Sequence, residues 1–348
     1  MTYMQNYHLE LVTWCASLWN TRYREFGGFD ILAFVDSLGK QEKMVNGYGM
    51  TDPRFGESYN ELISQWASTT FKNMMPMVLE VCKKTKVGFA VGEGGKLVMH
   101  APTDLFKLVS TVFDNYFKAP HEVTLRGVLG LGFKMIQNFQ TELMNIVNTE
   151  SLIDIDAMMA MTNSSMQFIT NTKGFCSQCA KLAGYQKEEI ERMFSSGMII
   201  KTWAGISNAA FLRFQQMLQN KLADDFMAIF NHKQFDCNAF TEKWFIYTGT
   251  LLQKLQKSYG QKCWRFVFEE FTTLYVGLII KESSDTYKPS ECVKFHSKVE
   301  QEIRDICHIF EEYVYEKDFE VHKNKLGAIR DILKDPPEQI MGHIGILR

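Results

Sequence analysis

The stretch Ala101-Pro102-Thr103-Asp104-Leu105-Phe106-Lys107-Leu108-Val109 decides the fold class. Pro102 suits the first turn of a helix, where its missing N–H costs no hydrogen bond. Asp104 adds a favourable negative charge near the N-terminus of that helix. Apolar residues then recur every three or four positions, at Leu105, Leu108, Val109, Val112, Phe113, Tyr116 and Phe117. This spacing predicts an α-helix that buries one face.

A second amphipathic pattern follows directly. Pro120 breaks the chain, and apolar residues then recur at Leu125, Leu129, Gly132, Ile136, Phe139, Leu143 and Ile146. Two long helices joined by a short loop are antiparallel neighbours whose apolar faces bury each other. We therefore expect the pair to form the start of a helical bundle.

The same pattern recurs along almost the whole chain. Further helices are predicted over 5–24, 30–43, 54–85, 151–172, 188–194, 207–230, 238–257, 259–282, 289–313 and 319–334. Only residues 85–100, which are rich in glycine, can hold strands or an ordered loop. The prediction is an all-α protein, an elongated rod of stacked antiparallel helical bundles. We place one bundle region in 1–150 and a second in 151–348.

Composition limits the possible functions. The 348 residues are 46% hydrophobic, with 27 Phe, which predicts a folded chain with a large core. A formal net charge of −2 gives no bulk attraction to nucleic acid or to an anionic bilayer. The eight cysteines are scattered, and no signal peptide precedes them, so we expect reduced thiols in a soluble, cytoplasmic protein. No apolar run approaches the ~20 residues that cross a bilayer.

Two motifs suggest chemistry at first sight. Gly92-Glu93-Gly94-Gly95-Lys96 partly matches a phosphate-binding loop, but Ala90 and Leu97 replace the first glycine and the final hydroxyl residue. We interpret it as a connection. Cys176 and Cys179 have the spacing of half a zinc site, yet no second pair exists and no βαβ context supports redox chemistry. We expect no metal there.

Other candidates also have simpler interpretations. Cys292, His296 and Glu300 are spaced by four residues, as metal ligands can be, but two of them lie on an apolar helix face. Asp154 and Asp156 lack the glycine and the glutamate of a calcium loop, and they suit a helix start. We predict no catalytic residues, no bound metal and no cofactor.

Lysines and methionines complete the set of candidates. Lys83, Lys84 and Lys86 form one basic cluster, and Lys323 and Lys325 form another; both are interpreted as surface charge rather than lipid sites. The methionines, among them Met74, Met75, Met77, Met158, Met159, Met161 and Met166, suit either an irregular core or an adaptable partner groove, with core packing favoured.

Three stretches resemble one known family. They are 58–66 (Ser-Tyr-Asn-Glu-Leu-Ile-Ser-Gln-Trp), 101–109 and 156–165 (Asp-Ala-Met-Met-Ala-Met-Thr-Asn-Ser-Ser). Their order and spacing are similar to the C-terminal part of the Sec-six subunit of the exocyst, the complex that tethers secretory vesicles. The heptads of the family's N-terminal coiled coil do not occur in this sequence. Assembly through that coiled coil is therefore not implied.

The resemblance implies a function without catalysis. It implies a vesicle-tethering scaffold in exocytosis that binds other exocyst subunits, SNARE proteins and their Sec-one/Munc-eighteen regulators. It also implies a cytoplasmic protein at plasma-membrane sites of secretion, with peripheral or indirect membrane contact and no nucleic acid partner. A Sec-six-like adaptor outside the exocyst, or a helical metal or redox protein, stays open as an alternative.

Overall fold

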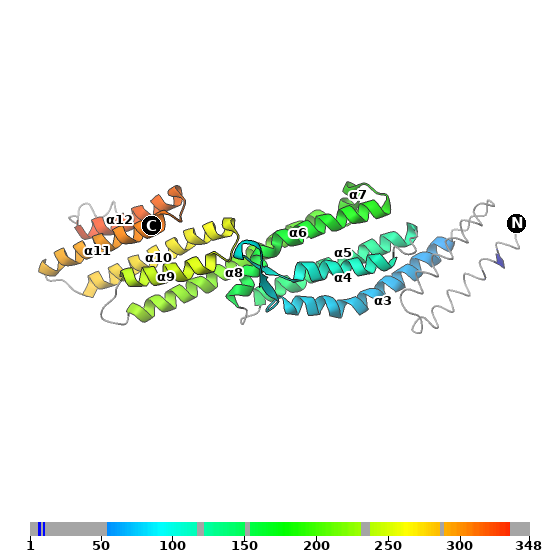
Figure 1. Ribbon diagram of the computed structural model, residues 1–348, viewed down its shortest axis with the longest axis horizontal. Coiled ribbons are helices and arrows are strands. Elements are labelled where there is room, and N and C mark those ends of the chain that lie inside the picture. The colour runs from blue at the N-terminus through cyan, green and yellow to red at the C-terminus, as the bar shows by residue number, and fades with distance from the viewer. Residues whose placement is uncertain are drawn as a thin grey trace. The chain divides into compact units, whose positions relative to one another are not determined.

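The computed structural model describes residues 54–116, 122–149, 154–230, 237–285 and 289–334, together with residues 6, 7 and 10. Apart from those three helical residues, the helices predicted for 5–24 and 30–43 lie outside the described part of the chain. Within that part the protein is almost entirely α-helical (Figure 1), which confirms the predicted fold class.

The chain folds into two compact units. The first contains residues 1–90, 99–157 and 164–209, and the second contains 91–98, 158–163 and 210–348. The predicted division into one bundle region over 1–150 and a second over 151–348 stays a prediction.

Long helices build the first unit around an aromatic core. Its helices are α3 (Arg54–Lys84), α4 (Ala101–Tyr116), α5 (Glu122–Thr149), most of α6 (Ile155–Ala183), α7 (Lys187–Met193) and the first part of α8 (Ser196–Phe230). Helices α3, α4 and α5 pack against one another. The ring of Phe175 on α6 lies edge-on to Phe113 and Phe133, with centroids 4.9 and 5.1 Å apart. These rings join α4, α5 and α6 in one core.

A buried tryptophan links α6 to α8 within the same unit. The indole of Trp203 stacks on Phe168, with centroids 4.1 Å apart. Its Nε1–H donates to Thr172 Oγ1 at 3.0 Å, so the buried donor is satisfied. Polar and apolar contacts therefore fix the same pair of helices.

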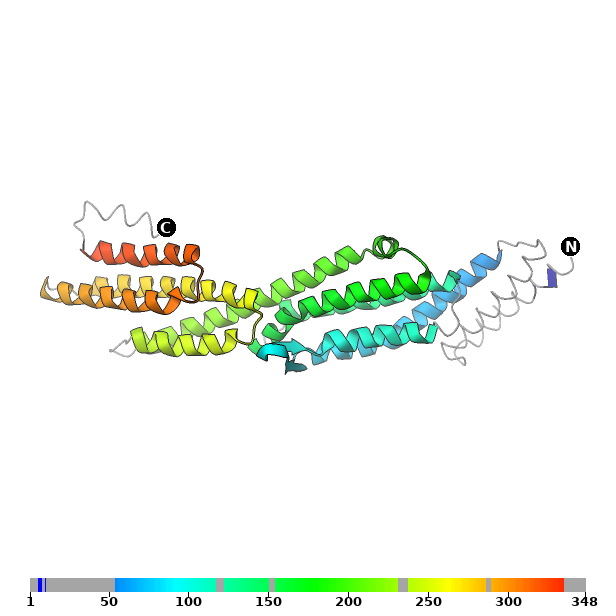
Figure 2. The same cartoon turned by 45° about the horizontal axis from the view of Figure 1, so that its top comes forward.

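The second unit contains the remaining helices side by side, as Figure 1 and Figure 2 both show for α9 to α12. Their bounds are α9 (Cys237–Leu252), α10 (Lys257–Asp285), α11 (Pro289–Glu311) and α12 (Glu316–Lys334). Helix α12 contacts α10 and α11, and α11 contacts α9. Short connections make successive helices antiparallel, because the chain must reverse at once. Phe268 and Phe310 stack at 4.5 Å in the core of this unit.

The stretch predicted to hold strands or an ordered loop, residues 85–100, does contain strands. Strands β1 (Phe89–Val91) and β2 (Leu97–Met99) pair in a two-stranded sheet, and a 3₁₀ turn, η1 (Glu93–Gly95), lies between them. Gly94 and Gly95 have φ of +65° and +77°, a region that only glycine occupies without strain. Strand structure in the described residues thus falls inside the predicted range 85–100.

Asn163 is the polar centre of the second unit. This residue of α6 is 3% exposed, and its Nδ2 donates to the carbonyls of Leu97 and Lys254, both at 2.7 Å. Its Oδ1 accepts from the Gln256 amide at 2.9 Å. The Leu97 amide in turn donates to Lys254 O at 3.0 Å. One buried side chain therefore holds the hairpin against the connection between α9 and α10.

The sequence signals for helix starts agree with the structure, whereas the glycines and the proline inside helices do not interrupt them. Pro102 lies in the first turn of α4, and Asp154 caps α6 by accepting from the Asp156 amide at 3.3 Å. The helix predicted over 151–172 continues through Gly174 to Ala183, and the helix predicted over 207–230 begins earlier, at Ser196, so that Gly197 lies inside it. Likewise α3 continues through Pro76. Packing outweighs the ~1 kcal/mol that a helical glycine costs.

Replacing Gly132 should destabilise the first unit. A Cβ there would lie 2.8 Å from Phe113 Cε2 and 2.9 Å from Phe175 Cζ, and both buried rings are held by their own packing. Gly132→Ala should cost about 1–3 kcal/mol of unfolding free energy through overpacking. Gly174→Ala is the matched control, since nothing lies within 4 Å of its Cβ, and it should gain up to about 1 kcal/mol. Urea denaturation followed by circular dichroism measures both; equal stability of the two variants would contradict the close approach.

Replacing Asn163 should destabilise the second unit. Asn163→Ala leaves the Leu97 carbonyl without its side-chain donor and the Gln256 amide without its acceptor, which should cost about 2–4 kcal/mol. Asn138→Ala is the control, because that side chain makes one exposed hydrogen bond, to Lys134 O, on its own helix. Thermal melts should show a large shift for Asn163→Ala only. Similar melting of the two variants would show that the network contributes little.

Candidate functional site: an aromatic groove in the second unit

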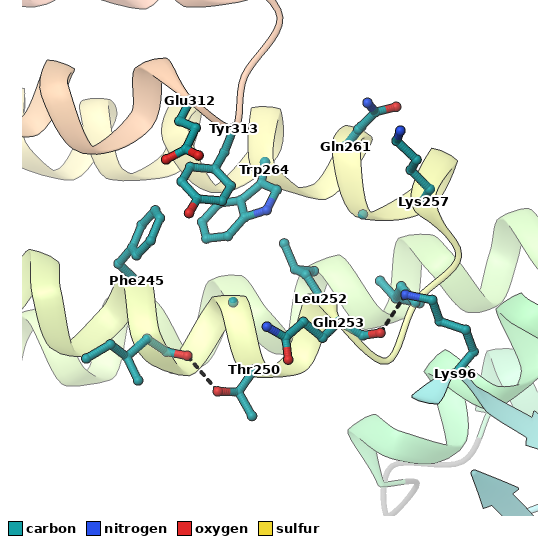
Figure 3. A pocket seen from close by; sticks show the side chains of 14 residues that line it. Lys96, Phe245, Thr250, Leu252, Gln253, Lys257, Gln261, Trp264, Glu312 and Tyr313 are labelled. Carbon is teal, nitrogen blue, oxygen red and sulfur yellow. Dashed lines mark hydrogen bonds between the residues drawn. The ribbon is translucent and has the colours of Figure 1, made fainter. Parts of the chain in front are cut away.

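Three aromatic side chains from different elements meet beside helix α9. Phe245 on α9 lies 4.8 Å from the ring of Trp264 on α10 and 4.8 Å from Tyr313, in the connection after α11. Trp264 and Tyr313 are 5.0 Å apart. The three rings lie near one another in Figure 3 and line one wall of a groove. Such a cluster gives a rigid apolar surface, since aromatic rings lose little conformational entropy on contact.

The groove has two connected parts. One hollow encloses about 670 Å³, and a second of about 460 Å³ shares Phe245, Ile246, Glu312 and Tyr313 with it. Ile246 is 69% exposed although its neighbours in the groove are aromatic. Together with the three rings, Ile246 extends one continuous apolar surface along the groove.

Charge differs between the two ends of the groove. Glu242, Glu311 and Glu312 line the second hollow, whereas Lys96 and Lys257 line the opposite end of the first. Figure 3 shows Glu312 and Lys96 at opposite ends. Among the described side chains neither Glu242 nor Glu312 has an ion-pair partner. The groove is therefore apolar along its length, acidic at one end and basic at the other.

Lys96, the lysine of the partial phosphate-loop motif, is fixed at the basic end. Its Nζ donates to Gln253 O at 2.6 Å, where α9 has just ended. The glycines before it form the turn between β1 and β2, whereas a phosphate loop leads from a strand into a helix. The interpretation as a connection is confirmed.

Cys176 and Cys179 lie buried on α6 with free thiols. Burial raises the pKa of both thiols, so the thiolate that binds metal or performs redox exchange is disfavoured. Within the part of the chain that the structure describes, no three His, Cys, Asp or Glu side chains cluster as metal ligands would. That these cysteines bind no metal stays a prediction.

Of the second candidate set, the structure describes the side chains of His296 and Glu300. His296 is half-buried on α11, and Glu300 forms an ion pair with Arg304 at 3.8 Å, one turn along the same helix. The side chain of Cys292 lies outside the described residues. A second histidine in this unit, His322 on α12, packs edge-on against Phe268, and burial lowers its pKa. It is a core residue.

The basic clusters are surface residues. Lys84 pairs with Glu80 at 3.9 Å, and Lys323 pairs with Glu320 at 2.9 Å, all of them exposed. The methionines divide: Met158, Met159 and Met161 are buried, as favoured, whereas Met77 and Met166 are about half exposed. Among the described helices, none combines the length and apolar character needed to cross a bilayer.

Sequence reasoning missed the groove. It predicted a helix over 238–257 but gave no role to Phe245 or Ile246. The signal was the run Trp244-Phe245-Ile246-Tyr247, because four consecutive apolar residues exceed what one buried face of a helix can hold. The helix predicted over 289–313 includes Tyr313, yet α11 ends at Glu311 and Tyr313 lies just beyond it.

Comparisons with solved structures agree with the helical fold. The crystal structure of the C-terminal domain of the exocyst subunit Sec6p is similar with a TM-score of 0.61 and 11% identity, over 84% of this chain and 82% of that one. The crystal structure of M-Sec is similar with a TM-score of 0.51 and 13% identity, over 99% of this chain and 61% of that one. At such identities the likeness concerns the fold.

The sequence itself gives the family. No curated protein matches the chain significantly. The family model described as exocyst complex component Sec6, in contrast, matches residues 1–347. The chain therefore belongs to the Sec6 family of exocyst components.

Proposed function

We propose that this chain is a non-enzymatic scaffold that works in vesicle tethering as a subunit of the exocyst. The match of the Sec6 family model to residues 1–347 carries the proposal. Family membership makes other exocyst subunits the first expected partners. SNARE proteins and their Sec-one/Munc-eighteen regulators are the second, as the resemblance of the sequence to the family implies.

The described surface is consistent with binding through protein contacts. Large apolar side chains are exposed in both units, among them Met77, Met166, Met198, Leu212, Ile246 and Ile280. Helical proteins bind one another through such positions, since an exposed helix face or groove accepts the apolar stripe of a partner helix. A scaffold needs only these surfaces, and no catalytic group takes part in the proposal.

Membrane association follows indirectly in this proposal. We place the protein in the cytoplasm, peripheral to plasma-membrane sites of secretion. The net charge of −2 offers no bulk attraction to anionic lipid, and Lys84 already pairs with Glu80. The subunits and SNARE proteins that it binds would therefore hold it at the membrane.

Affinity purification of the endogenous, tagged chain from its native cells tests the proposal. We expect other exocyst subunits in near-equal amounts, and direct binding of a purified plasma-membrane SNARE protein. Recovery of none of the subunits would contradict the exocyst assignment and favour an adaptor outside the complex.

A lysine variant separates protein contacts from lipid contacts. Simultaneous substitution of Lys83, Lys84 and Lys86 by alanine should leave the recovered subunits unchanged, because these side chains belong to no apolar contact surface. Liposome flotation with anionic vesicles should be weak for both the native chain and the variant. Strong flotation that the substitution abolishes would instead identify a direct membrane-binding protein.

A further inference from the structure

We propose that the groove between α9, α10 and the α11–α12 connection binds one amphipathic α-helix of a partner protein, with basic residues at one end of that helix and acidic residues at the other. This inference rests on the proposed scaffold function, since it assigns a surface and a partner chemistry to it. Four properties of the groove support it: its composition, its shape, its length and its charges.

The composition of the groove requires an apolar partner face. Phe245, Trp264 and Tyr313 form its aromatic wall, and Ile246 projects at its rim with 69% of its surface exposed. Aromatic anchors in a hollow are the positions that contribute most to protein binding. A small molecule would bury most of itself in an enclosed pocket, whereas an exposed rim suits a longer partner that covers Ile246.

The shape of the groove requires a convex partner. A second copy of this chain pairs this patch with itself in a two-fold interface, and its hollows are filled only where a projecting side chain such as Ile246 enters them. A single helix laid lengthwise fills such a groove with side chains at positions i, i+3, i+4 and i+7.

The length of the groove fits about three helical turns. On α9, Glu242 lines one end of the groove and Leu252 lines the other, ten residues away in one continuous helix. At 1.5 Å per residue this separation is about 15 Å. A partner helix of about eleven residues spans that distance.

The charges of the groove set the polarity of the partner. Basic side chains on the partner would meet Glu242, Glu311 and Glu312, and acidic side chains would meet Lys96 and Lys257. The connection that carries Tyr313 is itself tied to α10, because the Tyr315 hydroxyl donates to Gln261 Oε1. The charged ends therefore lie on a preformed frame and can select a partner by charge.

A displayed peptide library tests this inference on the full 348-residue chain. Each 14-residue peptide has apolar residues fixed at i, i+3, i+4 and i+7 and random residues elsewhere. Selection should enrich peptides with basic residues at one end and acidic residues at the other. Ile246→Asp should weaken their binding about tenfold or more, because it places a charge on the apolar rim that the partner helix would cover. Leu212→Asp, a substitution of an equally exposed residue on α8, should leave binding unchanged.

A charge reversal gives a gain-of-function control. The double variant Glu311→Lys, Glu312→Lys should lose the selected peptides and prefer peptides that are acidic at both ends. Circular dichroism melts establish that each variant is folded.

Several results would overturn the inference. They are the absence of enriched peptides, the absence of charge asymmetry, or equal binding to Ile246→Asp. Competition by a peptide of residues 335–348 would make the occupant a segment of this chain. A dimer that Ile246→Asp dissociates would make it a second copy. None of these results concerns the recovery of exocyst subunits by the native chain. Failure of the groove proposal is therefore distinguishable from failure of the proposed scaffold function.

Discussion

Burial of the Asn163 side chain is the constraint on which the second unit depends. An amide inside an apolar helix costs free energy unless its donors and acceptor are all used. Here both hydrogens of Nδ2 and the Oδ1 oxygen have backbone partners, contributed by β2 and by the connection after α9. The side chain of Gln256 also binds Asn163, because its Nε2 donates to the Asn163 backbone oxygen at 2.9 Å. A satisfied network of this kind specifies one arrangement, because any other leaves buried polar groups unpaired.

This network also shapes the groove. It holds the α9–α10 connection, and Lys96 of the hairpin reaches from there to Gln253 at the basic end. The aromatic wall then follows from the packing of α9 and α10 with the end of α11. One polar contact and one apolar cluster thus position opposite ends of the same surface. The proposed partner helix would use both.

Local signals predicted most of the fold. Helical periodicity, Pro102 at a helix start, acidic residues at the α6 start and glycines between 85 and 100 are all properties of neighbouring residues, and the structure agrees with them. Gly174 and Gly197 misled the prediction because tertiary packing keeps them helical. The groove and the Asn163 network depend on contacts between residues far apart in the chain, as between Asn163 and Gln256. Periodicity carries no information about such contacts, so Phe245 and Ile246 were not assigned.

Amide hydrogen exchange at Leu97 and Gln256 shows whether the Asn163 side chain holds the hairpin and the α9–α10 connection together. The Leu97 amide donates to Lys254 O, and the Gln256 amide donates to Asn163 Oδ1. If one buried side chain holds the hairpin and the α9–α10 connection together, both amides exchange slowly in the native chain. Both should then accelerate together in Asn163→Ala, while core amides of α5 in the first unit stay protected. Unchanged exchange at Leu97 and Gln256 in that variant would contradict the account.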